Sequence, residues 1–286
     1  MRTVGTVVRG IRTPIIKEND KLDDIVVDSL IKASEDPDYG FKFKDRDVVA
    51  ITEAVVGISE GNYATIDDIA VDIKNKLNNP EDLGIVFPIL SRNRFSLILK
   101  GIAKSTKKLY VLLSFPSDEV GNGILDEEKF ENSKFDLSSV ITEEEYSKYF
   151  GDFLHPFTGI NMIDFYRELI KEQGCEPVFI LSNKATDILK YTNNVINCDI
   201  HTRYKTKELL KKSGANVIGL FEILNSPVNG SGYNEKYGLL GSNKSTEERL
   251  KLFPRDGQRI VESVQKKLKE ITGKNIEVMV YGDGAF

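Results

Sequence analysis

The amino-acid sequence predicts an α/β protein built on a parallel sheet. The first observation is a regular alternation of strand-like and helical segments between residues 160 and 224. The second is a set of short, continuous apolar runs, such as Val48–Ile51 and Leu109–Phe115, which are typical of strands buried on both faces. Strand–helix alternation of this kind indicates βαβ units, in which helices cover a parallel sheet.

The individual elements follow from the two hydrophobic periods, about two residues for a strand and about 3.6 for a helix. The predicted strands are Val4–Val8, Val48–Ile51, Leu83–Leu90, Leu109–Phe115, Val178–Leu181, Val195–Cys198, Val217–Leu220 and Ile276–Val280. The predicted helices are Leu22–Lys32, Ile66–Leu77, Met162–Lys171, Thr186–Tyr191, Thr206–Lys212 and Arg259–Ile271. Thr65 is positioned to cap the second of these helices, and the segment Asn225–Ser245 is predicted to be a loop.

Composition restricts the class of protein. The 286 residues include 39 Lys and Arg and 44 Asp and Glu, so the net charge is −5 and a general nucleic-acid partner is not expected. No apolar run approaches the roughly 20 residues of a membrane span, and the N-terminus lacks a signal-peptide pattern. Since two Cys are too few for a disulfide framework, we expect a cytoplasmic protein that does not bind membranes.

Acidic side chains follow three of the predicted strands. Glu53 and Glu60 follow the first buried strand, Asp118 and Glu119 follow a later one, and Asp283 follows the last. Ligands of open α/β sheets collect at the carboxyl ends of strands, where converging carboxylates need a neutralising cation such as Mg²⁺ or Mn²⁺. The alternative is that these acids are ordinary polar residues of solvated loops.

Two basic segments are candidates for anion binding. Arg92 and Arg94, in Ser91–Phe95, have the bidentate donors that suit a phosphate or carboxylate; the alternative is a strand edge protected by charge. Gly238–Ser245 resembles a phosphate loop, but Asn243 stands where the Walker pattern has glycine. The segment can still be an anion-binding turn before a helix that does not follow the Walker pattern.

The remaining reactive residues give weaker signals. His155 and His201 are isolated in the sequence and do not form a zinc motif. His201 follows a predicted strand, so it is either a site residue or an ordinary residue at the entry of a helix. Cys198 ends an apolar strand and is expected to be buried. Without a Gly-x-Ser-x-Gly elbow or a Gly-x-Gly-x-x-Gly fingerprint, hydrolase and dehydrogenase functions are disfavoured.

Several short motifs, taken together and in order, resemble a known family. They are Asp47–Glu53 with Ser59–Gly61, Ser117–Asn122, Leu252–Gly257, Thr272–Lys274 and Val278–Gly284. The family that they resemble is that of the coenzyme F420-0:glutamyl ligases. The first two segments are similar to its N-terminal strand and Ser-Lys-x-Glu-Gly-Arg loop, and Ser117–Asn122 is similar to its Gly-[Ile/Val]-Asp-x-Ser-Asn loop. The last three are similar to its Leu-Pro-x-Asp-Pro-Asp segment, its Thr-Gly-Lys motif and its Thr-Asp-Thr-x-Gly motif. In particular, the sequence resembles the longer bacterial ligase-like members.

The resemblance implies site roles. In that family, aspartates of the second and last motifs bind two divalent metals that hold GTP, which implies that Asp118 and Asp283 are metal ligands for Mg²⁺ or Mn²⁺. The residues expected to contact the nucleotide or substrates are Glu119, Asn122, Asp256, Gly282 and Gly284. Those expected to act in catalysis are Glu60, Arg92 and Arg94. The two arginines are included as substitute cations, because Ile58 and Asn62 stand where the family loop carries Lys and Arg.

The resemblance also implies a domain organisation. Residues 1–124 and 241–286 correspond to the family's α+β core, and residues 125–240 are expected to be an inserted Rossmann-like α/β domain. The chain stops soon after Asp283, so the C-terminal part of the family's fold is expected to be missing. The family forms dimers, so a homodimer is expected here.

The reaction implied is an amide ligation. A substrate carboxylate would be activated by GTP or ATP as an acyl phosphate and captured by an amino acid, glutamate in the named family. One alternative is a non-catalytic module that retains a nucleotide or metabolite site. Another is a different phosphoryl-transfer enzyme whose specificity lies near Ser182–Asn183 and Asp199–His201.

Overall fold

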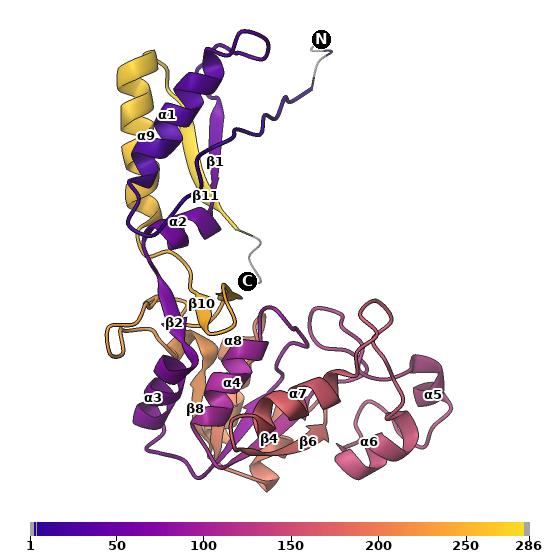
Figure 1. Cartoon of the computed structure of the whole chain (residues 1–286). Coiled ribbons are helices and arrows are strands. Elements are labelled where there is room, and N and C mark those ends of the chain that lie inside the picture. Colours follow the sequence, from indigo (N-terminus) through magenta and orange to yellow (C-terminus); the bar gives the residue numbers. More distant parts are fainter. Residues whose placement is uncertain (1–2, 4, 283–286) are drawn as a thin grey trace. The chain divides into compact units, whose positions relative to one another are not determined.

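The computed structural model describes residue 3 and residues 5–282, and this part of the chain divides into two compact units (Figure 1). Among the described residues, the first unit combines residue 3 and residues 5–62 with residues 254–282. The second unit spans Tyr63–Phe253. Each unit has a hydrophobic core of its own, so each can be understood by itself.

The second unit is built on a six-stranded sheet with the order β5-β6-β4-β3-β7-β8. Its strands are β3 (Asp82–Val86), β4 (Lys108–Leu113), β5 (Ile141–Thr142), β6 (Glu176–Leu181), β7 (Asn194–Asn197) and β8 (Asn216–Gly219). All neighbouring pairs are parallel except β5 with β6. The sequence-based prediction of an α/β fold with a parallel sheet is therefore confirmed.

The chain changes direction across this sheet at one point. From β3 it proceeds through β4 to β6 on one side, and then returns to place β7 and β8 on the other side of β3. This makes the sheet doubly wound, with a topological switch point between β3 and β7. Crevices outside the carboxyl ends of strands at such a point are the usual ligand sites of open α/β sheets.

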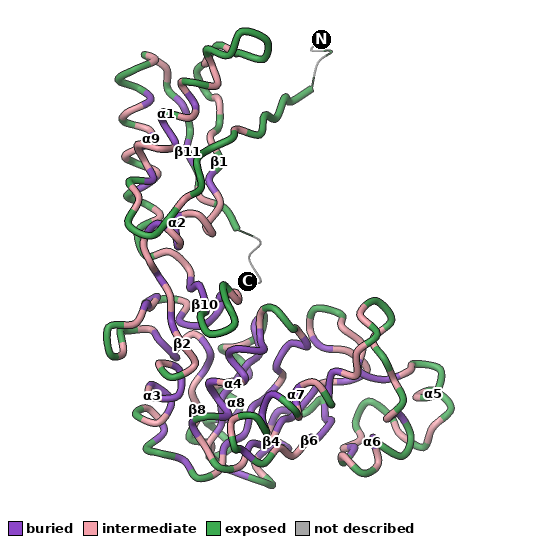
Figure 2. The backbone as a smooth tube through the Cα atoms, in the orientation of Figure 1, coloured by how far each residue is buried: buried purple, intermediate pink, exposed green. Residues whose placement is uncertain are grey.

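Helices cover both faces of the sheet because alternate strand residues point to opposite sides. Ile85 and Val111 belong to the main core, together with residues of α3 (Ile66–Lys76), α4 (Ser96–Lys104) and α7 (Met162–Lys171). Their chain neighbours Val86 and Leu112 pack in a second cluster with the 3₁₀ helix η1 (Ala185–Lys190) and α8 (Arg203–Lys212). Figure 2 shows the central strands as buried.

The rest of the second unit consists of short elements. They are the helices α5 (Glu127–Glu131), α6 (Glu143–Phe150) and η2 (Leu220–Glu222), and a three-stranded sheet of β2 (Tyr63–Thr65), β10 (Arg249–Lys251) and β9 (Asn243–Lys244). The segment Gly238–Ser245 contains β9 and leads into β10, so it is not a turn that directly precedes a helix. The predicted α-helix Thr186–Tyr191 is instead the 3₁₀ helix η1.

The compact units and the predicted domains are divided at different residues, and the predicted domains stay a prediction. The predicted insertion begins at residue 125, but β3 and β4 from before this position share one sheet with β6, β7 and β8 from after it. The boundaries between compact units fall instead at residues 62/63 and 253/254. Strand pairing, which joins segments distant in sequence, is the physical reason for the difference.

The first unit packs α1 (Leu22–Ser34) and α9 (Gly257–Thr272) with a two-stranded parallel sheet of β1 (Val48–Thr52) and β11 (Glu277–Tyr281). Burial of β1 on both faces was the expectation, and it is wrong: Val48 is 61% exposed, while Ile51 is buried. The reason is that Val49 and Ile51 face the core formed with α1 and α9, whereas Val48 and Ala50 on the opposite face are exposed.

Two further expectations for the N-terminal part of the chain are not met. Glu53 does not lie in a loop but begins the helix α2 (Glu53–Ser59), because Thr52 accepts a hydrogen bond from the Val55 N–H and caps it. Residues 5–8 of the predicted first strand pair with no other strand, and Val4 lies outside the described residues. Across the described ranges, none of the helices has both the length and the apolar composition needed to cross a bilayer.

Gly101 is predicted to be required for the contact of α4 with α3. A Cβ at this position would lie 2.7 Å from the Cβ of Ile69. Gly-to-Ala changes inside helices ordinarily raise stability by about 0.5–1 kcal/mol, but overpacking costs about 1–3 kcal/mol. Gly101→Ala should therefore lower the free energy of unfolding in urea. Gly123→Ala, whose Cβ would meet Phe153 at an ordinary 3.6 Å, should change it little, and equal values for both variants would contradict the packing argument.

Asp23 is predicted to make the first unit sensitive to acid. Burial raises the pKa of this carboxyl, but hydrogen bonds from Lys267 and Ser263 of α9 outweigh burial and lower the pKa to about 2. Because the folded-state pKa is below the ordinary value of 3.8, the stabilisation is present above pH 4 and lost as the pH falls toward 2. Asp23→Asn should flatten unfolding free energies measured between pH 5 and 2. Asp28→Asn, an exposed change on the same helix, should keep the wild-type slope.

Candidate functional site at the carboxyl ends of the parallel strands

The loop after β4 carries the acid that sequence analysis singled out. Asp118 is 7% exposed. Its Oδ1 accepts the backbone N–H groups of Val120 at 3.0 Å and Asn122 at 2.8 Å. Its Oδ2 accepts the N–H of Leu90 at 2.7 Å and the side-chain amide of Asn122 at 2.8 Å. Since a carboxylate offers roughly four acceptor directions, Asp118 is fully hydrogen-bonded and fastens the loop after β4 to the loop after β3.

The next residue makes the corresponding link to β7. Glu119 accepts the N–H of Ile200 at 2.7 Å through Oε1. Its Oε2 accepts the N–H of His201 at 3.0 Å and lies 2.8 Å from Nδ1 of the same residue. Because β3 stands between β4 and β7, Glu119 reaches across the end of β3. Two consecutive carboxylates therefore join the loops on both sides of the switch point.

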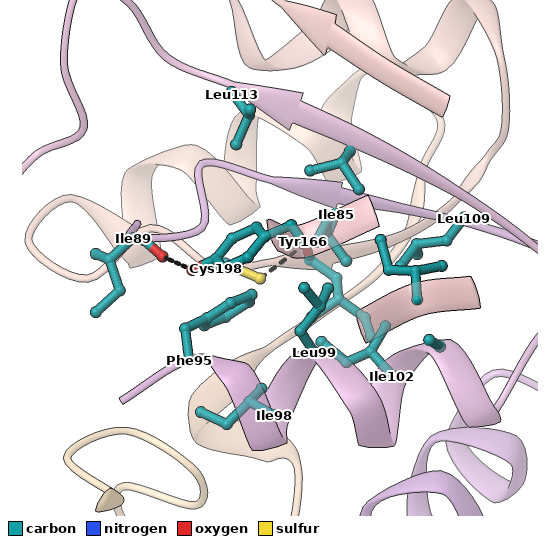
Figure 3. Close-up of a cluster of buried hydrophobic side chains, with 14 of the residues drawn as sticks. Ile85, Ile89, Phe95, Ile98, Leu99, Ile102, Leu109, Leu113, Tyr166 and Cys198 are labelled. Carbon is teal, nitrogen blue, oxygen red and sulfur yellow. Dashed lines mark hydrogen bonds between the residues drawn. The ribbon is translucent and has the colours of Figure 1, made fainter. Parts of the chain in front are cut away.

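A cluster of buried hydrophobic side chains, which includes Ile89, Phe95 and Tyr166, packs next to these loops (Figure 3). The Tyr166 hydroxyl donates to the Ile89 carbonyl at 2.6 Å and accepts the Ser91 N–H at 2.9 Å. Phe95 packs against the Tyr166 ring, with ring centroids 6.0 Å apart. Burial raises the pKa of both the Tyr166 hydroxyl and the Cys198 thiol, so both stay neutral. The prediction that Cys198 is a buried apolar residue is confirmed.

Asp199 fixes the loop that presents His201. Its Oδ1 accepts the Thr202 N–H at 3.0 Å, and its Oδ2 accepts hydroxyl hydrogen bonds from Thr202 and Thr206. Thr206 lies in the first turn of α8, so the carboxylate anchors the loop to the start of this helix. This arrangement holds His201 at a defined place after β7.

The two basic segments of the sequence lie next to each other. The N–H of Lys244 donates to the carbonyl of Asn93 at 3.0 Å, which places Gly238–Ser245 beside the turn that contains Arg92 and Arg94. Arg92 is exposed, and Arg94 is partly buried with its N–H bound to the Ser91 hydroxyl at 3.1 Å. Their predicted catalytic roles stay predictions.

The site residues predicted in the first unit lie around the start of α9. The Glu60 side chain is 8% exposed and accepts the N–H groups of Arg255 at 2.7 Å and Asp256 at 2.9 Å. Asp256 directly precedes α9 and lies 3.4 Å from Nε of Arg259. Glu60 therefore holds the N-terminus of the helix, whose partial positive charge favours a carboxylate there.

Gly282 ends the described chain, and a Cβ there would lie 2.6 Å from Cγ of Glu53. Asp283 and Gly284 lie outside the described residues. Within residues 5–282, no three His, Cys, Asp or Glu side chains lie close enough to hold a metal ion. Of the two predicted metal ligands only Asp118 is described, and its oxygens accept four hydrogen bonds, so a cation there has to displace at least one of these donors. The metal roles of Asp118 and Asp283 remain predictions.

Sequence reasoning identified Asp118, Glu119 and Asn122 as neighbours in one strand-end loop, but it did not find their partners. Leu90 and Ile200 contribute only backbone N–H groups, which leave no signature in residue type. His201 was noted only for its position after a strand. The contact with Glu119 depends on strand order, which single-strand patterns do not encode.

The second unit places this protein in the class of doubly wound α/β proteins. Its acidic loops lie at the switch point of the sheet. The family model for F420-0:gamma-glutamyl ligase matches residues 10–285, nearly the whole chain. The chain therefore belongs to the F420-0:gamma-glutamyl ligase family, as the motif resemblance predicted. Neither the curated proteins nor the solved structures compared with it gave a match.

Glu60 is predicted to contribute stability through the start of α9. In Glu60→Gln the amide nitrogen would face one of the two N–H donors, so we expect a loss of about 1–3 kcal/mol in unfolding free energy. Glu262→Gln is the control, because this exposed residue of α9 interacts only with Gln258 among described residues. If Glu60→Gln unfolds like the wild type yet loses activity, Glu60 acts in catalysis and the anchoring role is wrong.

Proposed function

We propose that the protein is an amide ligase that uses GTP or ATP and a divalent cation, Mg²⁺ or Mn²⁺, to join an amino acid to a substrate carboxylate through an acyl phosphate. Membership of the F420-0:gamma-glutamyl ligase family is the observation that carries this proposal. Glutamate is the first amino acid to test, because it is the one in the family's description. The acceptor is a small-molecule carboxylate.

The site assignment follows the motifs. Asp118 and Asp283 are proposed to be required for divalent-dependent nucleotide binding, with Glu119, Asn122, Asp256, Gly282 and Gly284 contributing contacts. The position of Asp118 at the carboxyl end of a parallel strand supports its part of this assignment. Asn122 donates its side-chain amide to Asp118, so a cation that binds Asp118 has to displace this amide first.

One observation favours the second candidate, a non-catalytic nucleotide- or metabolite-binding module. Both oxygens of Asp118 and both oxygens of Glu119 are engaged by N–H donors of neighbouring loops. Carboxylates satisfied in this way stabilise a fold without any ligand. Turnover separates the two candidates, since a module binds nucleotide without releasing phosphate.

The test measures GTP binding and phosphate release with Mn²⁺, glutamate and a panel of carboxylates. The wild type should bind GTP only with the cation, and Asp118→Asn and Asp283→Asn should each weaken that binding at least tenfold. Asp136→Asn, a change in an exposed loop, serves as the control with unchanged binding. Because Asp118→Asn also removes a loop contact, binding is measured at a temperature where every variant is folded.

Two results would contradict the proposal. Divalent-dependent binding that survives both substitutions would remove the site assignment. Tight nucleotide binding without phosphate release, for any carboxylate and amino acid tested, would favour the non-catalytic module.

A further inference from the structure

The contact between Glu119 and His201 lies at the switch point of the sheet. Glu119 comes from the loop after β4 and His201 from the loop after β7, on either side of β3. Glu119 is also the direct neighbour of Asp118 in the chain. The pair therefore stands where doubly wound sheets bind ligands, beside the residue assigned above to nucleotide binding.

The contact with Glu119 favours one tautomer of the imidazole. An ionised carboxylate only accepts hydrogen bonds, so the nitrogen that faces Glu119, Nδ1, is the donor in the neutral ring. Nε2 is then left with its lone pair. The His201 side chain is 49% exposed, and in the described chain no hydrogen bond engages Nε2.

The carboxylate is held more firmly than a flexible surface partner. Besides Nδ1, the N–H groups of Ile200 and His201 bind Glu119 at 2.7 and 3.0 Å, and only 20% of the Glu119 side chain is exposed. These two backbone contacts already join the loop after β4 to the loop after β7. The imidazole adds no further link between segments, but its orientation is fixed by the carboxylate, as in carboxylate–histidine pairs that prepare the second ring nitrogen for chemistry.

The other histidine of the chain lacks these features. In His155, Nδ1 lies 3.3 Å from the Thr158 N–H of its own turn and so acts as the acceptor. No carboxylate pairs with His155 in the described residues. His155 thus provides a matched control for His201.

We propose that Nε2 of His201 is the proton acceptor of the ligation step and that Glu119 is its positioning residue; this inference rests on the proposed function. The ammonium group of the incoming amino acid gives one proton to Nε2. Its nitrogen then attacks the acyl carbon of the acyl phosphate, the C–N bond forms, and the C–O bond to phosphate breaks. The second proton of the nitrogen leaves with the phosphate, and the imidazolium returns its proton to water.

The test is chemical rescue in the full-length protein. His201→Ala should lower kcat for GTP-dependent amide formation by about 100-fold or more, the usual contribution of a general base. Added imidazole should restore part of this loss, and Mn²⁺–GTP binding should be unchanged. His155→Ala should retain wild-type kcat. Glu119→Gln, which removes the charge that orients the ring, should lower kcat in the wild type but not further in His201→Ala, because Glu119 acts through the ring.

A second variant separates proton transfer from loop tethering. His201→Asn retains a side-chain donor for Glu119 but has no basic nitrogen, so it should be as inactive as His201→Ala. An active His201→Asn, or a loss in His201→Ala that imidazole does not restore, overturns the role of His201 while the ligase proposal stands. A wild-type chain without amide formation overturns both.

Discussion

The organisation of the second unit depends on two adjacent carboxylates at the end of β4. Asp118 binds the loop after β3, and Glu119 binds the loop after β7. Parallel strands bring their carboxyl ends to one edge, but strand pairing alone does not order the loops that follow them. Charge-assisted hydrogen bonds to backbone N–H groups supply that order, because a buried carboxylate requires donors and the loops provide them.

Both functional proposals concern the same loop after β4. The loop that carries Asp118 also presents Glu119, the partner of His201, so the residue proposed for nucleotide binding and the one that positions the proton acceptor are consecutive in the chain. Membership of the F420-0:gamma-glutamyl ligase family gives the reaction class. Asp118 accepts the side-chain amide of Asn122, so the proposed cation binding requires displacement of this amide.

Much of the fold could be predicted from the sequence, because periodicity is a local signal. The helix Met162–Lys171 is observed with the predicted bounds, and Thr65 caps α3 with a capping box as expected. What could not be predicted depends on pairing between distant segments. The exposure of Val48 depends on which face of β1 the helices cover, and the link from Glu119 to His201 follows from strand order. The anchoring of α9 by Glu60 also uses backbone donors that residue types do not reveal.

The position of the cation tests the central claim most directly. Crystals grown with GTP and Mn²⁺ would locate the metal by its anomalous scattering. The account predicts a peak at coordination distance from a carboxylate oxygen of Asp118, about 2.1 Å for ions of this size, with the Asn122 amide displaced. A bound Mn²⁺–GTP elsewhere, with Asp118 still holding Leu90, Val120 and Asn122, would contradict it.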